Sequence, residues 1–295
     1  MEIAVVAEVP VRNPEGGRQG ITRPVGLTSQ ALLSQEAPDG LNFRMVRSQF
    51  FGGAKAYSTP RHHHAFQQIR FAESGNLNYA PDRHIPQGSI AYFPRGAWYG
   101  PQMKDNGVSL AIQWGFEGEH QHGTEWDKYR AEALARLKAR GTFEQGFYTE
   151  ADPATGEPER KDGVQALYEE QYETRTGQKF VIPDEGYDAP ILMHPAAFQY
   201  FAVAPGVAMK NLGCFFDHPG PNGDVSISMV RLSDGGSYEL GPERAQLAWS
   251  LQAGLDTAGT VHPEFTCLYS GREESQTLSS RAVVEVFVVT LPRLD

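Results

Sequence analysis

The stretch from residue 62 to residue 103 places the strongest constraint on how this chain can fold. It opens with three consecutive histidines and continues with a mixture of polar and apolar residues. Side chains of an extended strand point to opposite faces in turn, so we expect His62, His64, Gln68 and Arg70 to share one face. The sequence therefore predicts that two imidazoles, an amide and a guanidinium meet in one pocket.

Turn-forming residues occur at several positions in this stretch. Gly75 follows the first run, and Gly88, Pro94 and Gly96 bracket a second apolar run. Together with the histidines, this spacing resembles the cupin superfamily. The first motif of that family is G-x5-H-x-H-x3-4-E-x6-G, and its second is G-x5-P-x-G-x2-H-x3-N.

The chain departs from the family pattern mainly at the ligand positions. Gln68 stands where the family has glutamate, Tyr99 where it has the last histidine, and Met103 where it has asparagine. The glycine expected six places before His62 is absent from the sequence. The turn residues support the fold, whereas the exchanged ligands concern the chemistry.

In the cupin superfamily the motif histidines and the glutamate hold a divalent metal inside a small β-barrel. The resemblance therefore implies a metal on His62, His64 and Gln68, with Tyr99 in place of the last imidazole. Iron, manganese, nickel and zinc all suit imidazole ligands, so the sequence leaves the metal open. The alternative is that the two histidines act as an acid and base pair without a metal, or have only a structural role.

Three interpretations of the function follow. In the first, a divalent metal binds an anionic organic substrate and reacts it with dioxygen, as in many proteins with two cupin barrels. In the second, His62 or His64 abstracts a proton beside a carbonyl and Tyr99 acts as the acid, which gives isomerase, dehydratase or cyclase chemistry. In the third, the chain binds a small ligand without catalysis.

A guanidinium inside an apolar barrel is costly unless it meets an anion, so Arg70 is expected to hold the substrate or to form an internal salt bridge. The residues expected to contact the substrate are Arg70, Gln68, Tyr92 and Trp98.

The composition limits the classes of partner that we expect the chain to bind. The formal net charge is −10 and no run of Lys and Arg occurs, so we expect a small-molecule substrate rather than nucleic acid or an anionic membrane. The two cysteines, Cys214 and Cys267, are too few for a disulfide framework. The N-terminus has an acid where a signal peptide needs basic residues, which favours a cytoplasmic location. We also expect a homodimer.

The order of predicted elements indicates a mainly β chain with two double-stranded β-helix barrels and a short helical connector. The first barrel, with a leading arm, covers residues 1–115, the connector 116–189 and the second barrel 190–295. Helical spacing predicts helices over 124–141 and 164–175, separated by a polar loop. Other predicted strands cover residues 3–6, 108–115, 198–203, 225–232, 245–252 and 283–291.

The second barrel is expected to lack a metal site. Glycines recur there at the spacing of the first motif, but the three ligand positions hold Gly241, Glu243 and Leu247. A further H-x-H pair, His120 and His122, has no matching motif, and we expect a loop there.

Overall fold

The computed structural model describes residues 1–12, 26–35, 41–53, 56–115, 124–182, 187–215 and 224–293. Most of the leading arm and the pair His120 and His122 lie outside these residues. The chain forms two compact units. Unit 1 comprises residues 1–10, 30–46 and 193–295, and unit 2 comprises residues 11–29 and 47–192. The expected boundaries at residues 115 and 189 remain predictions.

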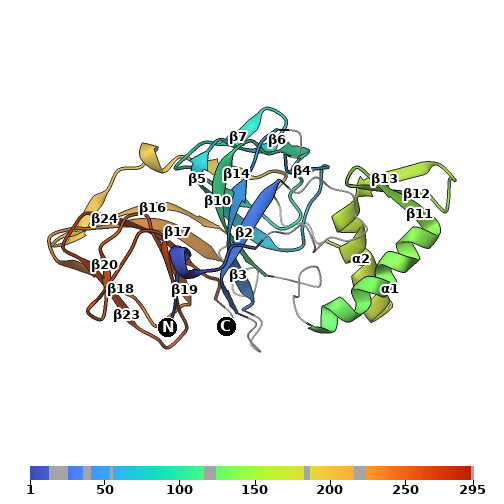
Figure 1. The fold of residues 1–295 in the computed structure, drawn as a ribbon. Coiled ribbons are helices and arrows are strands. Elements are labelled where there is room, and N and C mark those ends of the chain that lie inside the picture. The colour runs from blue at the N-terminus through green and yellow to red at the C-terminus, as the bar shows by residue number, and fades with distance from the viewer. Residues whose placement is uncertain are drawn as a thin grey trace. The chain divides into compact units, whose positions relative to one another are not determined.

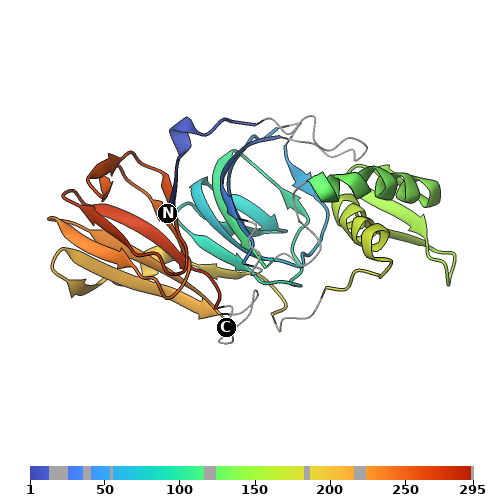
Figure 2. The ribbon, with the colours of Figure 1, turned by 90° about the horizontal axis from the view of Figure 1, so that it is seen from below.

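The chain is mainly β, as the sequence predicts (Figure 1). At the centre of unit 2 lie β8 (Ile90–Phe93), β5 (Gln67–Gly75) and β10 (Gly107–Trp114), which are antiparallel neighbours. Further strands that lie wholly or partly in unit 2 are β2 (Leu27–Gln35), β3 (Phe43–Phe50), β4 (Ser58–Thr59), β6 (Leu77–Ala80), β7 (Arg83–Ile85), β9 (Gln102–Met103) and β14 (Ile191–Met193). Figure 2 shows the strands of unit 2, coloured blue to green, curving around an interior.

The alternation of side chains on β5 determines what faces this interior. Gln68 and Arg70 lie opposite Phe93 and Ala91 on β8, and residues directly opposite in an antiparallel pair share a face. A core cluster on this side contains Phe50, Ala72, Leu77, Tyr79, Ile85, Ala91, Phe93 and Tyr99. The interior of the barrel is thus apolar, with polar side chains of β5 set into it.

The motif glycine Gly75 is required by the backbone. Its φ is +78°, in the left-handed region, and a Cβ at this position would lie 2.5 Å from the carbonyl oxygen of Asn106. A side chain would therefore be both strained and in collision with β10. Gly88 has a φ of +74° but open space around it, so it supplies only the turn.

The connector folds into a small module within unit 2. Helix α1 (Thr124–Arg140) and helix α2 (Gly163–Thr176) match the predicted ranges. Asp162 caps α2 by accepting hydrogen bonds from the backbone N–H groups of Val164 and Gln165. The core of the module is formed by Ala133, Leu137, Tyr148, Ala166 and Leu167.

The predicted polar loop between the helices was wrong in part. It contains β12 (Phe147–Ala151) and β13 (Pro158–Asp162), which pair with each other, while β11 (Gly141–Glu144) pairs with β12. The residues of β13 are polar and mostly exposed, so no apolar alternation marks the strand. None of the described helices has the length and apolar composition needed to cross a membrane.

Unit 1 contains two antiparallel sheets. The larger has the order β1-β22-β19-β24-β17-β16-β15 and the smaller β18-β23-β20-β21. Their strands are β1 (Glu2–Val5), β15 (Phe201–Ala204), β16 (Val207–Phe215), β17 (Val225–Leu232), β18 (Gly236–Leu240), β19 (Gln246–Ser250), β20 (Leu255–Thr257), β21 (Thr260–His262), β22 (Thr266–Ser270), β23 (Gln276–Ser280) and β24 (Val284–Thr290). Short 3-10 turns cover Val6–Glu8 and Pro195–Ala197.

The core of unit 1 lies between these two sheets and is aliphatic. It contains Val230, Leu240, Ala248, Leu268 and Val286, together with further buried aliphatic residues. The edge strand β1 comes from the leading arm and pairs with β22. The start of the chain is therefore part of the sheet of unit 1.

Candidate functional site

A pair of residues far apart in sequence forms the centre of the candidate site. His62 and Tyr99 form an antiparallel bridge, in which the N–H of His62 donates to the carbonyl of Tyr99 at 2.9 Å and the reverse bond measures 3.0 Å. Side chains directly opposite in such a bridge share a face. The two rings are accordingly in contact, with centroids 4.3 Å apart.

The predicted continuous strand from His62 to Arg70 was wrong. The strand β5 begins only at Gln67, and a bend at Ala65 and Phe66 precedes it. Nevertheless, His62 and His64 lie together, with ring centroids 5.0 Å apart. The ring of His64 also lies 5.8 Å from that of Tyr99. The two imidazoles thus come together at the bridge to Tyr99, and not through alternation along one continuous strand.

Hydrogen bonding fixes the tautomer of His62. Its Nδ1 lies 2.8 Å from the carbonyl oxygen of Pro60. Because a carbonyl oxygen can only accept, Nδ1 carries a proton, and in the neutral imidazole the lone pair is therefore on Nε2. His62 is 6% exposed, whereas His64 is half-buried. His62 is therefore an oriented base, and His64 is the more accessible of the two.

Gln68 and Arg70 lie on the same side of the barrel as Tyr99. The Arg70 guanidinium carbon lies 5.4 Å from the ring centroid of Tyr99 and 4.8 Å from that of Phe93. With its amide oxygen turned toward Arg70, Gln68 accepts from Nε at 2.9 Å and Nη2 at 3.2 Å. The other end of the Gln68 amide contacts Gln113. We call His62, His64, Gln68, Arg70 and Tyr99 the barrel cluster.

The described residues supply no ion pair for Arg70. The carboxylate nearest in sequence, Glu73 on β5, is paired with Arg47, whose Nε donates to it at 2.8 Å. The guanidinium of Arg70 is half-buried and makes contacts only with an amide and two aromatic rings in the part of the chain that the structure describes. This leaves a cation suited to an external anion.

A second cation in this barrel was missed by the sequence analysis. Lys104 is 1% exposed, and its ammonium group donates to the backbone carbonyl of Asn78 and lies 5.5 Å from the ring centroid of Phe50. Burial, and then the nearby charge of Arg70, lower the pKa of Lys104 well below its usual value. No local pattern in the sequence predicts that Lys104 is buried, because it follows the exposed Met103 at the end of β9.

Two predicted contact residues do not join the barrel cluster. Tyr92 lies opposite Ile69 and so faces away from Gln68 and Arg70. Its hydroxyl donates to Gln67 Oε1 at 2.7 Å, and burial raises the pKa of this hydroxyl far above its usual value. Tyr92 is therefore a structural donor on the opposite face.

Trp98 also differs from its predicted position. It is 41% exposed, and its ring stacks on that of His63 at 3.9 Å between centroids. Because Trp98 and His63 directly adjoin Tyr99 and His62, alternation turns both of them to the other side. Trp98 thus lies at the surface.

The barrel cluster does not fit a three-ligand metal centre. Among the described residues, no three of His, Cys, Asp and Glu come together as a group that could hold a metal ion. Gln68, the predicted third ligand, directs its amide toward Gln113 and Arg70. Catalytic metal sites normally use three protein ligands, and a guanidinium beside the site opposes a divalent cation.

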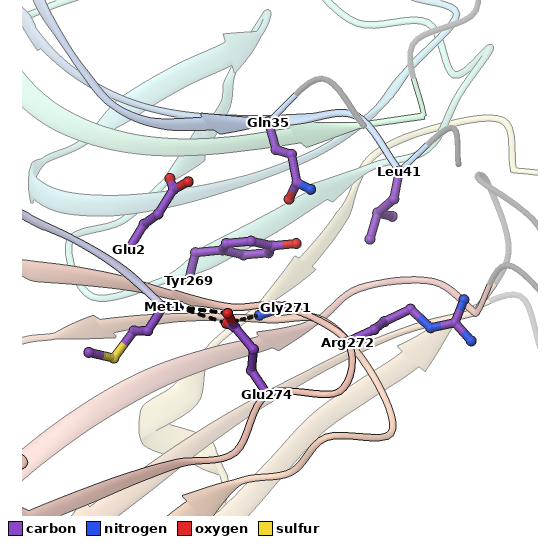
Figure 3. Close-up of a pocket in the computed structure, with 8 residues that line it drawn as sticks. All are labelled: Met1, Glu2, Gln35, Leu41, Tyr269, Gly271, Arg272 and Glu274. Carbon is purple, nitrogen blue, oxygen red and sulfur yellow. Dashed lines mark hydrogen bonds and ion pairs between the residues drawn. The ribbon is translucent and has the colours of Figure 1, made fainter. Parts of the chain in front are cut away.

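A pocket of about 270 Å³ lies in unit 1 and contains none of the predicted residues. Figure 3 shows that one carboxylate of the lining is paired: Glu274 accepts from the N-terminal ammonium group of Met1 and from the N–H of Gly271, each at 2.9 Å. The remaining lining residues are Glu2, Gln35, Leu41, Tyr269 and Arg272. We assign no chemistry to this pocket.

The fold was compared with solved structures. A putative dioxygenase from Nostoc punctiforme aligns with a TM-score of 0.57 and 11% identity, over 99% of this chain and 82% of that protein. HEPD from Streptomyces albus, with 2-hydroxyethylphosphonate and Fe(II) bound, aligns with a TM-score of 0.54 and 11% identity, over 99% of this chain and 76% of that protein. A mutant of oxalate decarboxylase from Bacillus subtilis aligns with a TM-score of 0.52 and 9% identity, over 100% of this chain and 78% of that protein.

The chain has the cupin fold. Its arrangement is similar to that of bicupins, since the alignment with oxalate decarboxylase covers the whole chain. No protein-family model matches the sequence, and no curated protein matches it either. At identities near 10%, these likenesses establish the cupin fold and leave the chemistry to the residues of the site.

Proposed function

We propose that the cupin barrel of unit 2 binds a small anionic organic compound and catalyses a proton transfer that does not depend on a metal. Arg70 binds the anionic group, His62 acts as the base and Tyr99 as the acid. The observation that carries the proposal is the contact of His62 and Tyr99 across one bridge, with the guanidinium carbon of Arg70 5.4 Å from the centroid of the same Tyr99 ring.

The base and the acid are well placed for this role. The bond to Pro60 fixes the ring of His62 with Nε2 as its basic nitrogen. Reciprocal backbone bonds hold Tyr99 opposite, so the distance between base and acid is set by the backbone rather than by flexible side chains. General acid and base groups held in this way typically contribute 10²- to 10⁴-fold, as an order of magnitude.

Metal-dependent oxygen chemistry is the second candidate. Two adjacent imidazoles support it, as do the Fe(II) bound in HEPD and the cupin enzymes among the structural neighbours. His62 and His64 would hold the metal, with Gln68 as the weak third ligand, and iron, manganese, nickel and zinc remain open. A bound metal would supply Lewis acidity or activate dioxygen. The exchange of carboxylate for Gln68 favours the first candidate.

A deuterium-exchange assay separates the candidates. Small anionic carbonyl compounds would be incubated with the protein in D₂O, and the loss of the proton beside the carbonyl would be followed by ¹H NMR. We expect exchange that survives chelation and falls about 10²- to 10⁴-fold in Tyr99→Phe. The matched control is Tyr92→Phe, which removes a phenol hydroxyl from the opposite face and should leave exchange unchanged.

Each other outcome has a definite meaning. Exchange or turnover that is lost on chelation and restored by one of the four metals would support metal-dependent chemistry instead. Tight binding of an anion without any exchange would favour a ligand-binding cupin without catalysis. Unchanged exchange in Tyr99→Phe would remove Tyr99 from the mechanism.

The remaining expectations about partners stand as proposals. A homodimer, a cytoplasmic location and the absence of nucleic-acid or membrane partners follow from composition and from the cupin resemblance. Sedimentation of the purified protein would test the dimer directly.

A further inference from the structure

The amide of Gln68 is buried against the guanidinium of Arg70. Gln68 is 2% exposed, and its amide lies 2.9 Å from Nε and 3.2 Å from Nη2 of Arg70, its neighbour on the same face of β5. Every N–H group of a guanidinium is a donor, so the amide atom that faces Arg70 is the oxygen. Gln68 is therefore an acceptor for Arg70, and its nitrogen points the other way.

The nitrogen end of this amide meets Gln113 on β10. Gln113 is 8% exposed, lies directly opposite Gln68 in the β5–β10 pair, and its amide contacts the amide of Gln68. Because the nitrogen of Gln68 donates, Gln113 presents its oxygen to it. Two paired strands thus hold the acceptor of Arg70 in place through two buried amides.

This contact uses only one side of the Arg70 guanidinium. The N–H of Nε and one N–H of Nη2 point to the same side of the planar group, and Gln68 occupies that side. The other N–H groups lie at the end of the fork, on Nη1 and Nη2. In the part of the chain that the structure describes, the further contacts of Arg70 are with the Phe93 and Tyr99 rings, and neither ring offers an oxygen acceptor at the end of the fork at hydrogen-bond distance.

The end of the fork is suited to a particular kind of ligand. Two parallel N–H groups match two oxygens of one carboxylate or one phosphate. Arg70 is half-buried, so a ligand can reach it from solvent. The orientation imposed by Gln68 therefore presents the end of the guanidinium, and not its side, to an anion.

The neutrality of Gln68 preserves the charge of Arg70. A glutamate has nearly the same shape, but beside Arg70 it would form an ion pair, as Glu73 on β5 does with Arg47. Such a pair would cancel most of the attraction that Arg70 exerts on a second anion. An amide of the same shape orients the guanidinium without neutralising it.

We propose that Gln68 is a positioning residue that determines the charge selectivity of the barrel cluster. It holds Arg70 by one side and leaves the charge and the end of the fork to a ligand with a two-oxygen anionic group, a carboxylate or a phosphate. This inference rests on the proposed function, since Arg70 must be the residue that binds the anion.

Isothermal titration calorimetry at pH 7.5, with EDTA present so that no metal contributes, would test the inference. The probes are butyrate, propyl phosphate and butyramide, and butyramide has the shape of butyrate without its charge. We expect the wild type to bind at least one of the two anions about tenfold or more tightly than butyramide. The anion that binds more tightly identifies the head group.

Two variants of Gln68 separate charge from orientation. Gln68→Glu keeps the shape and neutralises Arg70, so its anion affinity should fall about tenfold or more and its preference over butyramide should disappear. Gln68→Met removes the acceptor but leaves Arg70 charged, so its anion affinity should fall about threefold or more while the preference remains. A merely structural role would change both variants alike. The matched control is Gln87→Glu, which adds the same charge at an exposed turn and should bind anions within about twofold of the wild type.

The failure of this inference and that of the proposed function give different results. Anion affinity within about twofold of the wild type in Gln68→Glu, together with its loss in Arg70→Met, would overturn the role of Gln68 alone. If Gln68→Glu does not fold, Gln68→Met decides, and wild-type affinity there would overturn the positioning role. Anion binding that persists in Arg70→Met would contradict the proposed function itself, and so would the failure of both anions to bind to the wild type.

Discussion

Replacing Lys104 by methionine should make the protein more stable at neutral pH. Burial and the charge of Arg70 lower the pKa of Lys104 in the folded state, whereas in the unfolded chain this pKa is about 10.4. The unfolded chain therefore binds one more proton than the folded protein at pH values between these two pKa values. Below the lower pKa the full penalty of burying the charge is present, and it disappears as the pH rises to about 10.4.

The size of the effect follows from linkage. With one extra proton bound in the unfolded state, the free energy of unfolding of the wild type rises by about 1.4 kcal/mol per pH unit within that window. Lys104→Met has no such contribution. The loss of the bond to the Asn78 carbonyl costs the variant about 1 kcal/mol, but this cost is the same at every pH.

Thermal unfolding at pH 7, 8 and 9 would measure this difference. Between the folded and the unfolded pKa of Lys104, the advantage of Lys104→Met in the unfolding midpoint should shrink by about 3 to 5 °C per pH unit as the pH rises, given the size of unit 2. Lys138→Met is the matched control, since Lys138 is exposed on α1, and its difference from the wild type should not vary with pH. A difference for Lys104→Met that stays constant or grows with pH would refute the reasoning.

Three further predictions concern the glycine of the first motif, the metal and the opposite face of the barrel. Gly75→Ala places Cβ 2.5 Å from a backbone oxygen at a positive φ, so it should lower the free energy of unfolding by about 3 kcal/mol or more in chemical denaturation. Gly88→Ala has a positive φ without the collision and should lower it by only about 1 to 2 kcal/mol. Equal losses in the two variants would count against the collision. Elemental analysis should find substoichiometric metal, the same in the wild type and in His64→Ala; one metal per chain that disappears in the variant would reverse this conclusion. Tyr92→Phe removes the donor to Gln67, so it should lower stability by about 1 to 2 kcal/mol and leave anion affinity unchanged, and weaker anion binding would place Tyr92 in the site.

Parts of the fold could be predicted because short-range rules produce them. The ranges of α1, α2 and β17 follow from the period of their apolar residues, and Gly75 and Gly88 mark turns that only a residue without Cβ enters easily. The strand β13 escaped detection, because an exposed strand with polar residues carries no alternation of apolar and polar positions.

The candidate site was predicted only in part, for a related reason. Arg70 and Gln68 share a face because they lie two residues apart on β5, and that relation is present in the sequence. His62 and His64 were placed correctly beside Tyr99 but for the wrong reason, since a bend rather than a continuous strand precedes β5. Because side chains alternate along the chain, the bridge at Tyr99 also turns the Trp98 side chain away from the barrel cluster.

The sequence by itself determined the cupin framework, because turn residues and the histidine pair are set by spacing along the chain. Tertiary structure decided which groups meet inside the barrel. It joined Tyr99 to His62 through a long-range bridge, turned Tyr92 to the opposite face and brought the charge of Lys104 near that of Arg70. The physical reason is that local conformation depends on neighbouring residues, whereas the pairing of distant strands depends on the packing of the whole core.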